Sequence, residues 1–97
     1  MTNLLMQRSE AIWEVDDAQR RLEEQKYICD ELKNGITCVK EYCADLVGHE
    51  RILYELERHL ECADEILHKC SAEVDAKFAE LQRIERTMAA KSQKKFT

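Results

Sequence analysis

The side chains best suited to chemistry in this sequence are its histidines and cysteines. His59 and Cys62 lie one helical turn apart, and Cys70 returns to nearly the same side of a helix as His59. If the chain turns at Gly48, Cys38 comes to lie opposite them. Thiol and imidazole groups are the ligands that zinc prefers. However, the sequence holds no C-x2-C or H-x3-H pair, and Cys62 and Cys70 are too far apart on one helix to share an ion. We therefore predict no metal ion and no other cofactor.

The cysteines give no stronger indication of catalysis. A Cys/His nucleophile pair needs an enclosed pocket, which a thin pair of helices seldom provides. Cys29, Cys43 and Cys70 fall on an apolar stripe, where we expect them to pack as small apolar residues. With a turn at Gly48, Cys29 would approach His68 or Cys70, so that oxidation could join Cys29 to Cys70. The phosphate loop, the dinucleotide-binding turn, G-x-S-x-G and H-E-x-x-H are absent. We predict that the protein is not an enzyme.

Helices must position these side chains, because an apolar residue recurs at every seventh position. The unbroken part of this column consists of Leu32, Val39, Leu46, Leu53, Leu60, Leu67, Val74, Leu81 and Met88. Continued towards the N-terminus, the column also includes Leu4, Ala11 and Ala18, with Gln25 as its one polar interruption. A spacing of seven is two helical turns, so the column forms one stripe along a helix. Gln25 and Lys77 are polar residues at such seam positions, and residues of this kind fix register at a cost in stability.

The composition also indicates long helices. The 97 residues include no proline, two glycines, 36% charged residues and 6% aromatic residues, which is typical of amphipathic helices and not of sheets. Thr2 or Asn3 can cap the first helix. We predict an all-α fold with a single domain over residues 1–90 and a basic, flexible tail over residues 91–97.

The stripe changes its register once, between Leu46 and Leu53. Before this point each stripe residue has its partner three positions earlier, and after it the partner lies three positions later. Gly48 falls in the gap, so we predict a turn near Gly48 and a long antiparallel helical hairpin. One alternative is a continuous helix with a coiled-coil stammer. Another is a turn at Asn34-Gly35, a strong turn dipeptide through which the apolar pattern runs unbroken. If both turns formed, the chain would have three helices.

The apolar surface is wider than the seam of a two-helix hairpin requires. Burying each large apolar side chain contributes about 1.5–3 kcal/mol, so this surplus favours a coiled coil or bundle formed with other chains. Trp13 is the strongest candidate anchor, because its heptad position points away from the second arm. The residues predicted to contact a partner are Met6, Trp13, Tyr27, Ile28, Ile52, Ile66, Leu67, Val74, Leu81, Ile84 and Met88.

The charge pattern disfavours nucleic acid as a partner. The net charge is −5, and the basic end that contains Lys91, Lys94 and Lys95 is typical of helix-terminal cations. No apolar run approaches the roughly 20 residues of a membrane span, and Met1–Glu10 lacks the pattern of a secretory signal. The five cysteines, odd in number and set within helical pattern, indicate reduced thiols. We therefore predict a cytoplasmic protein, with the nucleus as the alternative compartment.

Together these features favour a structural role. We predict a structural or adaptor subunit that co-assembles through amphipathic helices into a heteromeric coiled-coil complex of the tethering, cytoskeletal or kinetochore type. Other helical subunits are the expected partners, and a hetero-oligomer is favoured over a homodimer. One alternative is a small helical chaperone that covers an amphipathic helix of a single client. A second is a homodimeric coiled-coil protein with weak nucleic-acid contact through its basic tail.

Overall fold

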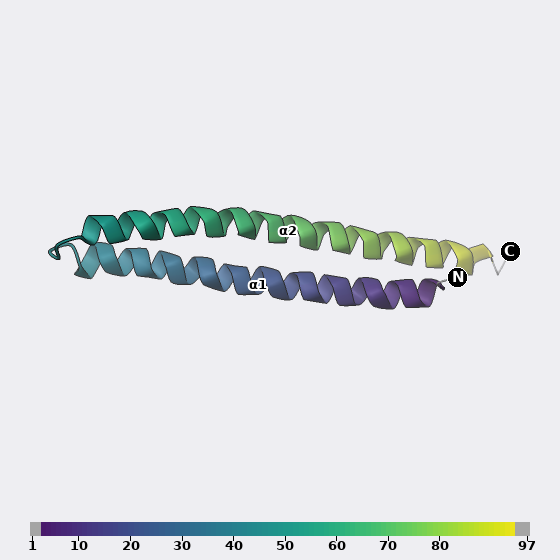
Figure 1. The fold of residues 1–97 in the computed structure, drawn as a ribbon. Coiled ribbons are helices and arrows are strands. Elements are labelled where there is room, and N and C mark those ends of the chain that lie inside the picture. The colour runs from purple at the N-terminus through teal and green to yellow at the C-terminus, as the bar shows by residue number, and fades with distance from the viewer. Residues whose placement is uncertain (1–2, 95–97) are drawn as a thin grey trace.

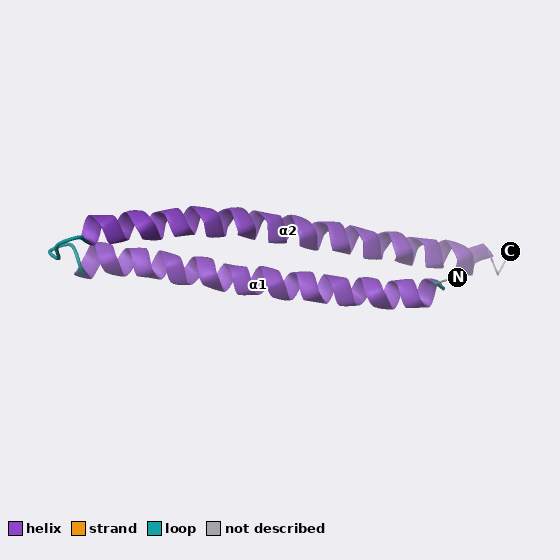
Figure 2. Cartoon of the chain, in the orientation of Figure 1, coloured by secondary structure: helices purple, strands orange, loops and turns teal. Residues whose placement is uncertain are grey.

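The protein is a long antiparallel helical hairpin. A computed structural model describes residues 3–94, in which α1 (Leu4–Tyr42) and α2 (His49–Lys94) run side by side and are joined by residues 43–48 (Figures 1 and 2). The molecule measures 76 × 22 × 14 Å, and its described part contains no strand. The predicted all-α hairpin is confirmed.

The loop lies where the stripe changes register. Gly48 adopts φ +86°, a left-handed conformation that glycine enters without steric cost. Its carbonyl accepts the first hydrogen bond of α2, from the Ile52 amide at 3.2 Å. Gly48 therefore precedes α2, whereas α1 already ends at Tyr42, with Cys43 as its C-cap. The turn predicted near Gly48 is confirmed. The loop occupies residues 43–48, so Gly48 is its last residue and not its centre.

The rival turn at Asn34-Gly35 is wrong. Gly35 lies within α1, which continues through it for seven more residues. The apolar pattern on either side of this dipeptide explains the continuity, because Cys29 and Ile36 are both buried against α2. The packing of these neighbours outweighs the local turn preference of Asn-Gly.

The observed ends of the helices agree only in part with the ends predicted from the sequence. Asn3 is the N-cap of α1, and its side chain accepts a 2.7 Å hydrogen bond from the Met6 amide. At the other end α2 extends to Lys94, so the helix continues four residues into the segment that we predicted to be a flexible tail. Residues 95–97, like Thr2, lie outside the described part of the chain.

The core is the seam between the two helices. Its buried residues all occupy stripe or stripe-partner positions: Ala11, Val15, Ala18, Cys29, Ile36, Ala63, Leu81 and Ile84. At the open end of the hairpin, Val15 and Leu81 belong to one cluster with Ala11 and Ile84, against which Leu4, Ile12 and Met88 pack. The heptad pattern therefore identified the residues that hold the hairpin together.

Polar contacts between the helices define how they are aligned. The amide of Gln25 donates a 3.0 Å hydrogen bond to the Ala63 carbonyl. Lys77 forms a 3.2 Å ion pair with Glu14, so both predicted polar seam residues are satisfied by the opposite helix.

Candidate interaction surface

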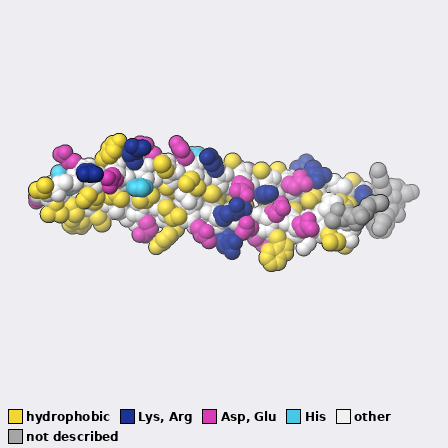
Figure 3. Space-filling view, viewed as in Figure 1, with side chains coloured by type: hydrophobic (Ala, Val, Ile, Leu, Met, Phe, Trp, Pro, Cys, Tyr) yellow, Lys and Arg dark blue, Asp and Glu magenta, His cyan; other side chains and the backbone are white. Residues whose placement is uncertain are grey.

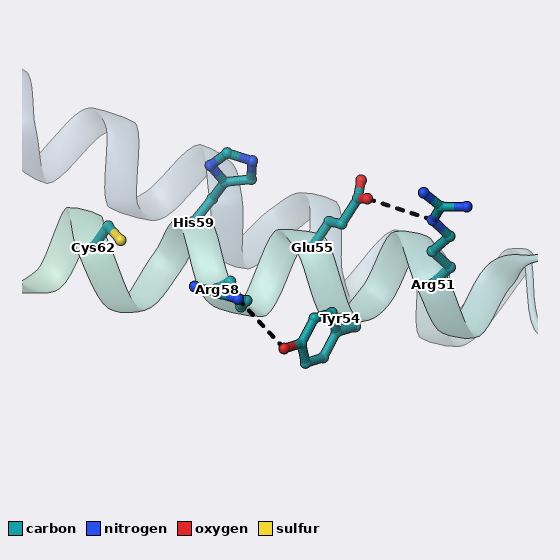
Figure 4. Close-up of a pocket in the computed structure, with 6 residues that line it drawn as sticks. All are labelled: Arg51, Tyr54, Glu55, Arg58, His59 and Cys62. Atoms are coloured by element: carbon teal, nitrogen blue, oxygen red, sulfur yellow. Dashed lines mark hydrogen bonds and ion pairs between the residues drawn. The ribbon is translucent and has the colours of Figure 1, made fainter.

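The candidate metal ligands do not come together. Within residues 3–94 there is no group of three His, Cys, Asp or Glu side chains that could hold a metal ion. His59 and Cys62 instead line a shallow groove of about 580 Å³ with four neighbours: Arg51, Tyr54, Glu55 and Arg58. All six residues belong to α2 (Figure 4). The groove is therefore a hollow on the surface of one helix.

The side chains around this groove are directed to different sides. His59 and Glu55 point to one side of the α2 ribbon and Tyr54 to the other (Figure 4). Arg51 pairs with Glu55 at 3.6 Å. The guanidinium of Arg58 lies 5.9 Å from the centre of the Tyr54 ring, close enough for a cation–π contact. These are contacts between successive turns of one helix, and they do not bring a nucleophile and a base onto a common point.

The buried thiol of Cys29 lies against Asp64 of α2, whereas the sequence predicted His68 or Cys70 as its neighbour. Burial raises the pKa of the Cys29 thiol, and a hydrogen bond to the Asp64 carboxylate raises it further. The expected approach of Cys29 to His68 or Cys70 is wrong, because the loop begins at residue 43 and shifts the level of α2 relative to α1. All five cysteines are free; Cys38 and Cys62 are exposed, and Cys43 and Cys70 are partly buried.

Uncovered apolar side chains are the most prominent feature of the surface. We use the term N-terminal patch for Leu5, Met6 and Trp13, which are 68%, 54% and 74% exposed on α1 near the open end of the hairpin. Met6 and Trp13 are seven residues apart and thus lie on the same side of the helix. Asp17 and Arg20, which form a 2.6 Å ion pair, border a small hollow beside Trp13. The patch therefore has an aromatic residue at one end with a polar rim next to it.

A second group of apolar residues lies nearer the loop. Its position follows from the 2.9 Å ion pair of Arg21 with Glu73, which joins the two helices at one edge of the seam. One heptad closer to the loop, Ile28 and Ile66 occupy the equivalent positions on α1 and α2. Both isoleucines are about half exposed.

The same relation extends to the loop itself. Two heptads beyond the isoleucine pair come Tyr42 and Ile52, both exposed, and between the two pairs lie Gly35 and His59. We call these six residues the loop-proximal face: Ile28, Gly35, Tyr42, Ile52, His59 and Ile66. Hydrophobic side chains gather at the loop end of the hairpin, whereas charged side chains predominate in the middle (Figure 3).

The predicted contact residues divide according to burial. Six of them are exposed: Met6, Trp13, Tyr27, Ile28, Ile52 and Ile66. Leu67, Val74 and Met88 are partly buried along the seam. Leu81 and Ile84 are buried between α1 and α2, so the hairpin's own packing already covers them, and we reassign them to the core. A heptad pattern cannot separate these cases, because a seam within the chain and a seam with a partner have the same spacing.

Several exposed apolar residues were absent from that prediction: Leu5, Tyr42, Leu46, Val47, Tyr54 and Phe78. For Tyr42 a signal was present, since it lies two heptads after Ile28. Leu46 and Val47 were hidden by the assumption that the first helix continues nearly to Gly48.

Comparisons with known proteins do not indicate a function for this chain. No protein-family model matches the chain, and neither a curated protein nor a solved structure is significantly similar to it. In the part of the chain that the structure describes, neither helix has a segment long and apolar enough to span a membrane.

Proposed function

We propose that this protein is a non-enzymatic structural subunit that joins other helical chains in a cytoplasmic assembly, with the N-terminal patch as its anchor. The observation that carries the proposal is Trp13, whose side chain is 74% exposed on a helix that has a well-packed seam on another side. A large aromatic residue left in solvent beside Leu5 and Met6 is typical of a contact site.

The energetics support a partner at this patch. Covering three large apolar side chains contributes about 1.5–3 kcal/mol for each fully buried one. Tryptophan is enriched among the residues that dominate binding energy, particularly where a polar rim excludes water from it. The Asp17–Arg20 ion pair supplies such a rim. A helix of the partner, laid along α1, would cover Met6 and Trp13 together because they share one side of α1.

The elongated shape fits the same role. A hairpin 76 Å long presents surfaces at widely separated points while its seam keeps the two helices aligned. Tethering, cytoskeletal and kinetochore complexes are the kinds of assembly in which we expect such a subunit.

A photo-crosslinking amino acid with a large aromatic side chain, benzoylphenylalanine, in place of Trp13 keeps an aromatic anchor at this position, and its introduction into the full chain in cells tests the proposal. We expect it to capture a defined protein in stoichiometric amount, and we expect Met6→Glu in the same chain to abolish that capture. The matched control has the crosslinker in place of Tyr54, another exposed aromatic residue, on α2. Equal capture of the same protein from Tyr54, or none from Trp13, would contradict the proposal.

A further inference from the structure

The loop-proximal face is large enough to form a stable interface. Together with the Arg21–Glu73 pair at its border, it extends about 32 Å from Arg21 to Tyr42 at a rise of 1.5 Å per residue, and the hairpin is 22 Å wide. This footprint is roughly 700 Å², close to the area of about 800 Å² that each partner contributes to a standard protein interface. None of the six residues of the face is a lysine, arginine, aspartate or glutamate.

The two borders of this face differ in charge. On α1, Glu24 and Glu31 lie four residues before and three residues after Ile28, and therefore on the same side of the helix. On α2, Lys69 lies three residues after Ile66. Within residues 3–94, no ion pair involves Glu24, Glu31 or Lys69, and all three are exposed. The unpaired charges at the border are thus acidic on α1 and basic on α2, where the other bordering residue with a charge, Glu55, is paired with Arg51.

These charges select one way of stacking two such faces. If the loops of two copies lie at the same end, α1 of one copy crosses onto α2 of the other, and Glu24 meets Lys69 of the second copy at the same level along the bundle. The Arg21–Glu73 pair is repeated between copies in the same way. If the loops lie at opposite ends, α1 stacks on α1 and α2 on α2, so Glu24 no longer lies against Lys69 of the second copy. Opposite charges at matching positions across a rim favour one arrangement over another, so the arrangement with both loops at one end is preferred.

The shapes of the two halves of the face are also complementary. An added Cβ at Gly35 would meet nothing within 4 Å, so this glycine leaves room for a side chain of the second copy. His59, which is exposed, lies at the same level on α2. In the arrangement with both loops at one end, His59 of each copy lies over Gly35 of the other, and Ile28 of each lies over Ile66.

We propose that the loop-proximal face binds a second copy of this chain, so that two hairpins form a symmetric four-helix bundle with both loops at the same end. Such a two-fold interface uses the same surface on both copies. The pairing goes beyond the proposed function, because it leaves the N-terminal patch free for a different partner. A failure of either proposal therefore leaves the other standing.

Light scattering during size-exclusion chromatography of the full chain tests the association. We expect about twice the chain mass of 11.4 kDa at tens of micromolar. A monomer over that whole range would overturn the proposal, and would indicate that a different helical chain covers this face.

Charge reversals test the arrangement. Each pair occurs twice in a symmetric dimer, so Glu24→Lys should weaken dimerisation by about tenfold, as should Lys69→Glu. Combining the two substitutions should restore it. The matched control is Glu23→Lys, which makes the same charge change at a neighbouring position directed away from the face. A dimer indifferent to all of these variants would overturn the proposal.

A distance measured between the two copies distinguishes directly between loops at the same end and loops at opposite ends. A spin label on Ser9→Cys, in a chain with Cys38 and Cys62 replaced by Ser, should lie within about 30 Å of its counterpart when both loops are at one end. With the loops at opposite ends and the face still shared, that distance would be about 80 Å. The longer distance would contradict the proposed bundle.

Discussion

Gln25 and Ala63 face each other across the hairpin, and the side-chain amide of Gln25 donates a 3.0 Å hydrogen bond to the Ala63 carbonyl. Gln25 is polar at a position where the other members of its heptad column on α1 are apolar. A polar residue at such a position typically specifies register while it lowers stability. We infer that Gln25 holds α1 and α2 in their observed alignment.

Replacing this glutamine should separate stability from register. We expect Gln25→Leu to raise the free energy of unfolding by about 1 kcal/mol, because it adds apolar surface to the seam. In a chain with Cys38 and Cys62 replaced by Ser, the distribution of distances between spin labels on Gln19→Cys and Ser71→Cys should broaden at the same time. Gln82→Leu, on the exposed side of α2, should change neither quantity. An unaltered distance distribution in Gln25→Leu would show that other contacts set the register.

The two glycines should respond in opposite directions to alanine. Gly35 lies inside α1 with open space around its missing Cβ, so Gly35→Ala should stabilise the hairpin by about 0.5–1 kcal/mol through helix propensity. Gly48 has φ +86°, so Gly48→Ala should destabilise it by about 1–2 kcal/mol. Urea unfolding at a low chain concentration measures both changes. A stabilising Gly48→Ala would mean that the loop has a different conformation in solution.

The sequence identified the helices and the seam but not the length of the loop. A heptad pattern specifies which side of a helix is apolar, and Val15, Ile36 and Leu81 are buried as this pattern predicts. The pattern does not say where a helix ends. Leu46 continues the apolar column in the sequence, yet it lies in the loop and is 60% exposed.

This ambiguity displaced part of the candidate site. Because the loop starts at Cys43, the residue of α2 that lies opposite Cys29 is Asp64. Cys70 is six residues further along α2. Ile84 was assigned to a partner interface but is buried within the hairpin. Its heptad position is the one expected both for the seam between α1 and α2 and for a seam with another chain, so the pattern could not distinguish the two. The exposure of Trp13 was easier to predict, because its heptad position lies far from the seam.

Cys29 should be the least reactive thiol of the chain. It is buried, whereas Cys38 and Cys62 are exposed, and burial also raises the pKa of the Cys29 thiol and disfavours the nucleophilic thiolate. We expect Cys29 to be alkylated at least on the order of 100-fold more slowly than the exposed pair, at a rate governed by opening of the hairpin. Mass spectrometry after timed iodoacetamide treatment measures the order. Early modification of Cys29 would show that the seam opens readily.

The same thiol should make stability depend on pH in alkaline solution. Its pKa is higher in the folded chain than the ordinary value of 9.0, so the unfolded chain loses this proton first. The contribution of Cys29 is therefore fully present below about pH 9 and is lost as the pH rises from there through the folded-state pKa. Urea unfolding of the native chain and of Cys29→Ala between pH 7 and pH 10.5 isolates this effect. A difference between them that stays constant over the range would contradict it.

Substitutions at Ile84 and Trp13 should distinguish folding from binding. Ile84 is 4% exposed within the core cluster at the open end, so Ile84→Ala should cost about 2–4 kcal/mol of unfolding free energy. Trp13 is largely exposed, so Trp13→Ala should change that free energy by less than about 0.5 kcal/mol. It should nevertheless weaken binding of the captured partner by about 2 kcal/mol, or roughly 30-fold. If Trp13→Ala instead destabilised the isolated hairpin as strongly as Ile84→Ala, Trp13 would belong to the chain's own packing, and the anchor proposed for other subunits would be lost.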